Sequence, residues 1–264
     1  MNLKYNRKAL FIAVALLSLG SFALVANATH SWGGYHWART SNPFTLKLGD
    51  NVSTQWDSVL ATTSSDWSQS TVLDTVVVPS GKNPRTCKAT LGRVEVCNTT
   101  YGNNGWLGIA SIWLSGGHIA QGTVKLNDTY FNTPTYNTLA WKNLVSCQEV
   151  GHTLGLTHQD EDFTNPNLGT CMDYANDPST NQHPNQHDYD MLEQIYAHLD
   201  STPTVGQNKN SNGFQDTPLE DVKDFGKEIA TSKDGRSSVF EKDLGNGHKV
   251  LTHVFWVEPR AHND

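Results

Sequence analysis

A short stretch near the middle of the chain, SCQEVGHTLGLTHQD at 146–160, carries residues that can hold a metal ion. Residues four apart lie on the same face of a helix, so the side chains of Gln148 and His152 would project together. Gly155 can end that helix, because glycine adopts the left-handed backbone conformation at little cost. The chain could then turn and bring His158 back towards the same point. The spacing therefore predicts a metal site formed by these three side chains.

Glu149 lies one step round the same helix, where it could reach a metal-bound water without binding the metal itself. A metal, two or three protein ligands, an open water position and an adjacent carboxylate are what metal-assisted amide hydrolysis needs. In such a site the metal acidifies the water and stabilises the oxyanion, and the carboxylate accepts the proton as a general base. Gln148 is an unusual residue among the three predicted metal ligands, because an amide oxygen is a weaker zinc ligand than an imidazole nitrogen.

The residues from Gln148 to His158 resemble the helix motif of the metzincin clan of zinc endopeptidases, HExxHxxGxxH/D, at every defining position except the first. A methionine turn follows in that clan, and here Met172 comes 14 residues after His158, with Tyr174 two residues later. The Met-x-Tyr form resembles the astacin branch, whereas the strand order and last helix are more similar to matrixins. The resemblance covers about residues 43–200.

This resemblance implies a secreted zinc endopeptidase with one catalytic Zn²⁺, which hydrolyses peptide bonds in protein or peptide substrates. His152 and His158 would be zinc ligands, with Gln148 in the position of the third. Glu149 would be the general base, and Tyr174 an oxyanion stabiliser or extra ligand. The alternative is a catalytically impaired protein of the same fold that acts as a secreted binding module. Retention of the general base favours the enzyme, because a binding module needs no acid beside its ligands.

Other residues could also bind a metal. The acidic run 160–162, together with Asn165 or Asn167, could bind Ca²⁺, although such a run is commonly a solvated loop. Three further histidines could reach the zinc site, although each is more readily explained as a strand or surface residue: His118, His183 and His187.

The elements that would position the site follow from local patterns. Residues 43–49 and 71–78 have the alternation or β-branched composition of strands, and 106–114 and 118–126 are typical of two strands joined by a tight turn. The second of these is expected to form the rim of the cleft and to pair with an extended substrate. Three helices are expected: one capped by Ser53, the site helix at about 138–154, and a last helix capped by Asn185.

Together these elements predict an α+β fold. We expect a metzincin-like domain over residues 29–200, with a twisted mixed sheet, an active-site helix, a methionine turn and a C-terminal helix. Residues 201–216 have the composition of a linker. Residues 217–264 form a small β extension of unknown role, with a hairpin around Gly245-Asn246-Gly247.

The N-terminus has the features of a secretory signal: basic residues, an apolar run and a small-x-small pattern that predicts cleavage after Ala28. Removing residues 1–28 takes three basic and no acidic residues from a chain with 19 basic and 26 acidic residues, which leaves a net charge of −10. That charge argues against nucleic acid or a membrane surface as a partner. We expect a monomer that is extracellular or periplasmic.

Four cysteines in an exported protein indicate two disulfides, for which three pairings are possible. Cys87 and Cys97 flank a stretch that is typical of a short hairpin, which favours their pairing. Cys147 would then pair with Cys171 and join the metal-site helix to the methionine segment.

Overall fold

The computed structural model describes residues 29–207 and 219–258 of the chain. The expected signal peptide at 1–28 and residues 208–216 of the expected linker lie outside the described residues. Within the described ranges, none of the helices combines the length and apolar character that crossing a bilayer requires.

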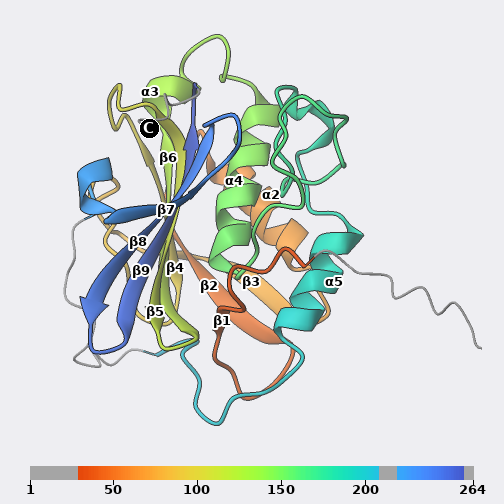
Figure 1. Cartoon of the computed structure of the whole chain (residues 1–264), viewed down its shortest axis with the longest axis vertical. Helices are drawn as coiled ribbons and strands as arrows, with labels where there is room; N and C mark the ends of the chain where they lie inside the picture. Colours follow the sequence, from red (N-terminus) through yellow and green to blue (C-terminus); the bar gives the residue numbers. More distant parts are fainter. Residues whose placement is uncertain (1–28, 208–218, 259–264) are drawn as a thin grey trace, which may run out of the picture.

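A mixed nine-stranded sheet forms the centre of the molecule (Figure 1). Its strands lie in the order β3-β2-β4-β6-β5-β9-β8-β7, with β1 paired to β6. Strands β1, β2, β3, β4 and β6 run parallel to one another, whereas the pairs β6–β5, β5–β9, β9–β8 and β8–β7 are antiparallel. The strands are β1 (His36–Trp37), β2 (Phe44–Asn51), β3 (Leu73–Pro79), β4 (Val94–Thr99), β5 (Trp106–Ser115), β6 (His118–Asn127), β7 (Lys227–Thr231), β8 (Ser237–Gly245) and β9 (His248–Trp256).

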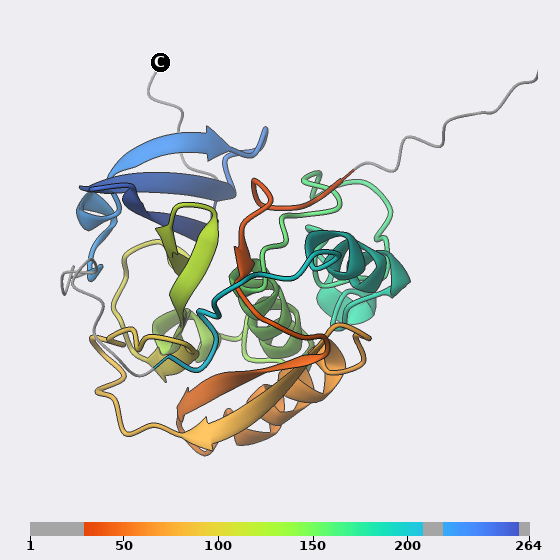
Figure 2. The same cartoon turned by 90° about the horizontal axis from the view of Figure 1, so that it is seen from below.

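The helices complete an α+β fold, as the sequence predicts. Helix α4 lies along the sheet with α2 beside it, and α5 lies further from the C-terminal strands (Figures 1 and 2). Two 3₁₀ turns occur in the loops, at Pro178–Thr180 and Val222–Asp224. The helices are α2 (Asp57–Trp67), α3 (Asp128–Phe131), α4 (Leu139–Thr153) and α5 (Gln186–Ile195).

The boundaries of the site helix α4 are confirmed. The side chain of Thr138 accepts a hydrogen bond from the amide of Trp141 at the start, and Leu154 is the C-cap. Gly155 follows with a φ of +99°, the left-handed conformation expected of it. The expected cap of the last helix is also confirmed, because Asn185 forms a capping box with Asp188 at the start of α5.

Several local expectations are wrong. Helix α2 begins at Asp57 after Trp56, and Ser53 lies in the preceding turn rather than at the cap. The stretch between Cys87 and Cys97 is a turn followed by β4, not a hairpin, because β4 pairs with β2 and β6 instead. Strand β6 lies between β4 and β5, so it has no free edge to offer a substrate.

The disulfides Cys87–Cys97 and Cys147–Cys171 are both present. The second one joins α4 to the segment that contains Met172. Two disulfides are typical of a protein that folds in an oxidising compartment outside the cytosol.

The C-terminal strands are integral to the sheet. The expected hairpin around Gly245-Asn246-Gly247 is confirmed as β8 and β9, and β9 pairs with β5 over its whole length. A second, smaller hydrophobic core forms where these strands join the sheet; it contains Trp106, Ile109, Trp113, Leu219, Phe225, Phe240, Val250, Val254 and Trp256. Figure 2 shows the C-terminal strands and the β2/β3 pair at opposite ends of the sheet.

Gly155→Ala should destabilise the fold by more than its backbone angle alone explains. A methyl group there would overlap the carbonyl oxygen of Tyr35. Gly116→Ala is the matched control, because Gly116 also has a positive φ, of +60°, but has no atom within 4 Å of an added methyl group. We expect a loss of about 1–2 kcal/mol for the control, and a further ~1–3 kcal/mol for Gly155→Ala, from denaturant unfolding. Equal losses for the two variants would contradict this packing.

Candidate metal centre

The end of α4 and the turn after it bring His152 and His158 together. Their ring centroids are 4.6 Å apart. The Nδ1 atom of His152 binds the carbonyl oxygen of Leu156 at 2.9 Å, and Nδ1 of His158 lies 3.5 Å from a carboxylate oxygen of Glu161. Nδ1 therefore carries the proton in His152, and Nε2 keeps a free lone pair, which is the usual arrangement of a metal-binding histidine.

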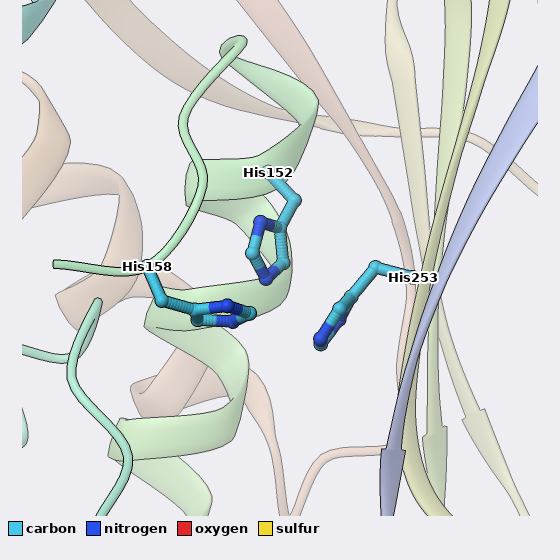
Figure 3. A group of neighbouring side chains, drawn as sticks. All are labelled: His152, His158 and His253. Carbon is cyan, nitrogen blue, oxygen red and sulfur yellow. The ribbon is translucent and has the colours of Figure 1, made fainter. Parts of the chain in front are cut away.

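A third histidine comes from the C-terminal strand β9. Figure 3 shows His253 projecting from β9 towards His152 and His158. Its ring centroid lies 4.0 Å from that of His152 and 4.9 Å from that of His158. One ring nitrogen of each of the three residues lies within 4.8 Å of the other two. We refer to His152, His158 and His253 as the α4 centre.

The α4 centre has the chemistry of a zinc site. The Nε2 atoms of His152 and His158 are buried and have no hydrogen-bond partner. Buried polar atoms without partners cost free energy, and a cation among them would remove that cost. Burial lowers the pKa values of His152 and His253 well below the ordinary histidine value, so both rings are held in the neutral form that binds metals. Three imidazole nitrogens suit Zn²⁺.

Glu149 lies next to the α4 centre. Its Oε2 atom is 3.0 Å from Nδ1 of His253, and its Oε1 atom is buried without a partner. Burial raises the pKa of this carboxyl group well above its usual range, and the nearby His158 and the amide of Ala110 partly offset that rise. The side chain fits against β5 because Gly108 has no Cβ, which would otherwise lie 2.8 Å from Oε1.

Tyr174 is also part of this site. Its hydroxyl group is 3.1 Å from Nε2 of His253, and its ring lies 4.1 Å from that of His158. The side chain is fully buried, which raises the pKa of the phenol well above its usual value. Met172 packs against α4 at Gly151, where an added Cβ would lie 2.6 Å from its sulfur. Met172 thus packs against the metal-site helix, and Tyr174 contacts two of the three histidines.

Gln148 is buried on α4, one helical turn before His152. Its amide nitrogen donates a hydrogen bond of 2.9 Å to the carbonyl oxygen of Cys171. That bond orients the side chain and leaves Oε1 as a buried acceptor without a partner. A free amide oxygen on this helix is consistent with a weak ligand for the same ion, and its role as a ligand stays a prediction.

The other histidines named from the sequence lie elsewhere. His118 contacts His36 and Asp200, His183 pairs with Asp66, and His187 stacks on His30. Calcium binding by the acidic run is not supported. The Oδ1 atoms of Asp160 and Asp162 accept hydrogen bonds from the backbone amides of Asp162 and Thr164, as in ordinary loop turns.

No family model and no curated protein sequence matches this chain. Among solved structures, the chain is similar to high choriolytic enzyme 1, a hatching-enzyme zinc protease from Oryzias latipes, at 10% identity and a TM-score of 0.33, over 61% of this chain and 94% of that one. It is also similar to myroilysin, at 11% identity and a TM-score of 0.35, over 67% of this chain and 98% of that one. Likenesses at this level assign neither activity nor residues to the chain.

We expect His253 to contribute to zinc binding at the α4 centre. His253→Ala should raise the zinc dissociation constant of this site by about 100-fold or more. Replacing a residue that only hydrogen-bonds to a metal ligand already weakens binding by about 10–100-fold, and loss of a ligand itself should cost at least as much. Gln148→Ala should have a smaller effect, because an amide oxygen is the weaker donor, and the two substitutions together should abolish binding. Competition with a fluorescent chelator measures each affinity. Wild-type affinity in His253→Ala would show that this histidine is not a ligand.

Proposed function

We propose that the chain is an exported zinc-dependent endopeptidase and that this conformation is its closed form. The observation that carries the proposal is the position of Glu149, a buried carboxylate beside three clustered histidines, two of which, His152 and His158, have an Nε2 atom without a partner. Amide hydrolysis needs a carboxylate at that place for proton transfer, whereas a site that only stores zinc needs none. Export is supported by the sequence of residues 1–28 and by the two disulfides.

Each residue of the site has a role in this reaction. When bound, zinc would supply Lewis acidity that activates water and polarises the peptide carbonyl group. His152 and His158 would hold the ion through Nε2, with Oε1 of Gln148 beside them. Glu149 would take the proton from the attacking water and return it to the leaving amine. Tyr174 would donate a hydrogen bond from its hydroxyl group to the carbonyl oxygen as charge develops there.

The closed form follows from the position of β9. Extended peptides bind to a free sheet edge through main-chain hydrogen bonds. Strand β5 has β6 on one side, and β9 covers its other side from Trp106, opposite Trp256, to Ser115, opposite His248. β9 therefore occupies the edge beside Glu149 at which an extended substrate would pair.

His253 also engages the two groups that the reaction needs. Its two ring nitrogens bind the carboxylate of Glu149 and the hydroxyl group of Tyr174. While these contacts last, neither group can act on a substrate. Departure of the C-terminal strands would free both groups and leave Gln148, His152 and His158 as the ligand set, with one position open for water. The proposal therefore makes β8 and β9 an internal inhibitor of the enzyme.

A zinc-binding module without turnover is the second candidate. The observation that favours it is the burial of the C-terminal strands, since Val250, Val254 and Trp256 pack in the second core. In this alternative the strands never leave, and zinc is a permanent link between α4 and β9. The two candidates differ in what happens when β9 is removed.

Removal of the C-terminal strands should convert the inactive chain into one that cleaves peptides. A recognition sequence for a specific protease, inserted after Gln207 in the full chain, allows residues 219–258 to be cut free and then separated in mild urea. With zinc present, the released enzyme should cleave a mixed pool of quenched fluorescent peptides, and the uncut chain should not. Glu149→Gln in the released enzyme should lower the rate by about 100-fold or more.

The uncut chain exposed to the same urea serves as the control, and circular dichroism after removal of the urea establishes that the released part has refolded. Adding residues 219–258 back as a peptide should restore inhibition. A refolded, zinc-loaded chain that cleaves no peptide in the pool would contradict the peptidase and leave the zinc-binding module.

A further inference from the structure

A second group of metal-binding side chains lies away from the α4 centre. His36 in β1, His118 at the start of β6, and His198 and Asp200 after α5 come from three separate segments of the chain. The Nε2 atoms of the three histidines lie 3.6, 3.2 and 3.7 Å from the same Oδ1 atom of Asp200. The Nε2 atoms of His36 and His198 are 3.1 Å apart. We refer to these four residues as the Asp200 cluster.

We propose that the Asp200 cluster is a second zinc site, with His36, His198 and Asp200 as ligands. Tetrahedral zinc with donors at 2.0–2.1 Å has its donor atoms about 3.3 Å from one another. The three distances among these donor atoms are 3.1, 3.6 and 3.7 Å, so the ligands are already close to that arrangement. His118 lies beside this set, with its Nε2 atom 3.2 Å from the same carboxylate oxygen.

The surroundings of the ligands orient them towards a common point. Nδ1 of His36 binds the carbonyl oxygen of Gly34 at 3.0 Å, which leaves its Nε2 lone pair directed into the cluster. Arg39 holds the other carboxylate oxygen of Asp200, through its guanidinium group at 3.0 Å and its backbone amide at 3.2 Å. Arg39 is itself buried and binds the carbonyl oxygens of Tyr196 and His198. Oδ1 of Asp200 is thereby kept for the histidines.

Hydrogen bonds account for only two contacts of the cluster, His118 with Oδ1 of Asp200 and His198 with His36, because the separations of 3.6 and 3.7 Å are longer than a hydrogen bond. Three imidazole groups share one carboxylate oxygen, and two of their Nε2 atoms also face each other. Because neutral His36 carries its proton on Nδ1, the hydrogen bond between the two Nε2 atoms requires that His198 carry its proton on Nε2, whereas zinc would bind both lone pairs. One zinc ion would bind Nε2 of His36, Nε2 of His198 and Oδ1 of Asp200 together.

The proposed site would tie together parts of the chain that are remote in sequence. β1 pairs with β6 over only two residues, with His36 opposite His118. The segment after α5 is attached to the same place, because the hydroxyl group of Thr204 binds the carbonyl oxygen of Ile119 and the amide of Ala38. Zinc here would act as a structural link between the N-terminal strand and the segment that leaves α5. This role does not depend on the proposed peptidase activity.

Zinc titration of the full-length mature chain tests the proposal, with bound zinc measured after equilibrium dialysis at about 1 μM free zinc. We expect two ions per chain in the wild type and one in His198→Ala. The His198 side chain is 56% exposed, so its removal leaves the core intact. His118→Ala should weaken binding less, because this residue lies beside the ligand set. His183→Ala is the matched control, since it removes a side chain that is 54% exposed and also pairs with an aspartate, and it should keep two ions.

The same measurement tests the two proposed zinc sites independently of each other. Loss of one ion in His152→Ala, together with loss of the other in His198→Ala, supports both sites. A wild-type chain with one ion that His198→Ala retains overturns the second site and leaves the α4 centre. One ion that is lost in His198→Ala but kept in His152→Ala supports the second site and overturns the first. A thermal unfolding midpoint that zinc raises in wild type and in His152→Ala, but less in His198→Ala, provides a readout independent of dialysis.

Discussion

The hydrogen bond between His253 and Glu149 joins residues 104 positions apart, and much of the structure serves to make it. A buried carboxylate without partners is costly, and His253 supplies the partner of Oε2 of Glu149. Strand β9 brings His253 beside Glu149 by pairing with β5, and the second hydrophobic core fixes it there. Gly108 in β5 lets the side chain of Glu149 fit against the sheet. One polar contact thus unites the middle of the chain with its C-terminal strands.

Local features of the site were predictable because local interactions determine them. Thr138 and Gly155 define the ends of α4 through a cap and a left-handed turn, both of which depend on neighbouring residues. The turn after α4 brings His158 beside His152, as the motif spacing indicates. The pairing of Cys147 with Cys171 was also foreseen, although the hairpin expected between the other two cysteines does not exist. The ends of α4 and the approach of His158 to His152 therefore follow from the sequence.

Strand order and the third histidine did not follow from local pattern. The sequence predicts the β8/β9 hairpin from its turn residues, but nothing local shows that β9 adds to β5. One signal was present: five of the seven residues from Val250 to Trp256 are apolar and they occupy both alternating sets of positions, which is typical of a strand buried on both faces. A separate two-stranded hairpin cannot bury both faces, and a single histidine inside such a run needs a buried partner. For the same reason the sequence led to the expectation of a free edge on β6, which the structure covers with β4 and β5.

The central claim is that His152, His158 and His253 form one zinc centre, and crystallography at the zinc absorption edge tests it most directly. In crystals of the mature chain grown with zinc, an anomalous difference peak should lie among the ring nitrogens of these three residues, at about 2.0–2.1 Å from each. The absence of a peak there, with His253 still bonded to Glu149 in the same crystal, would contradict the account.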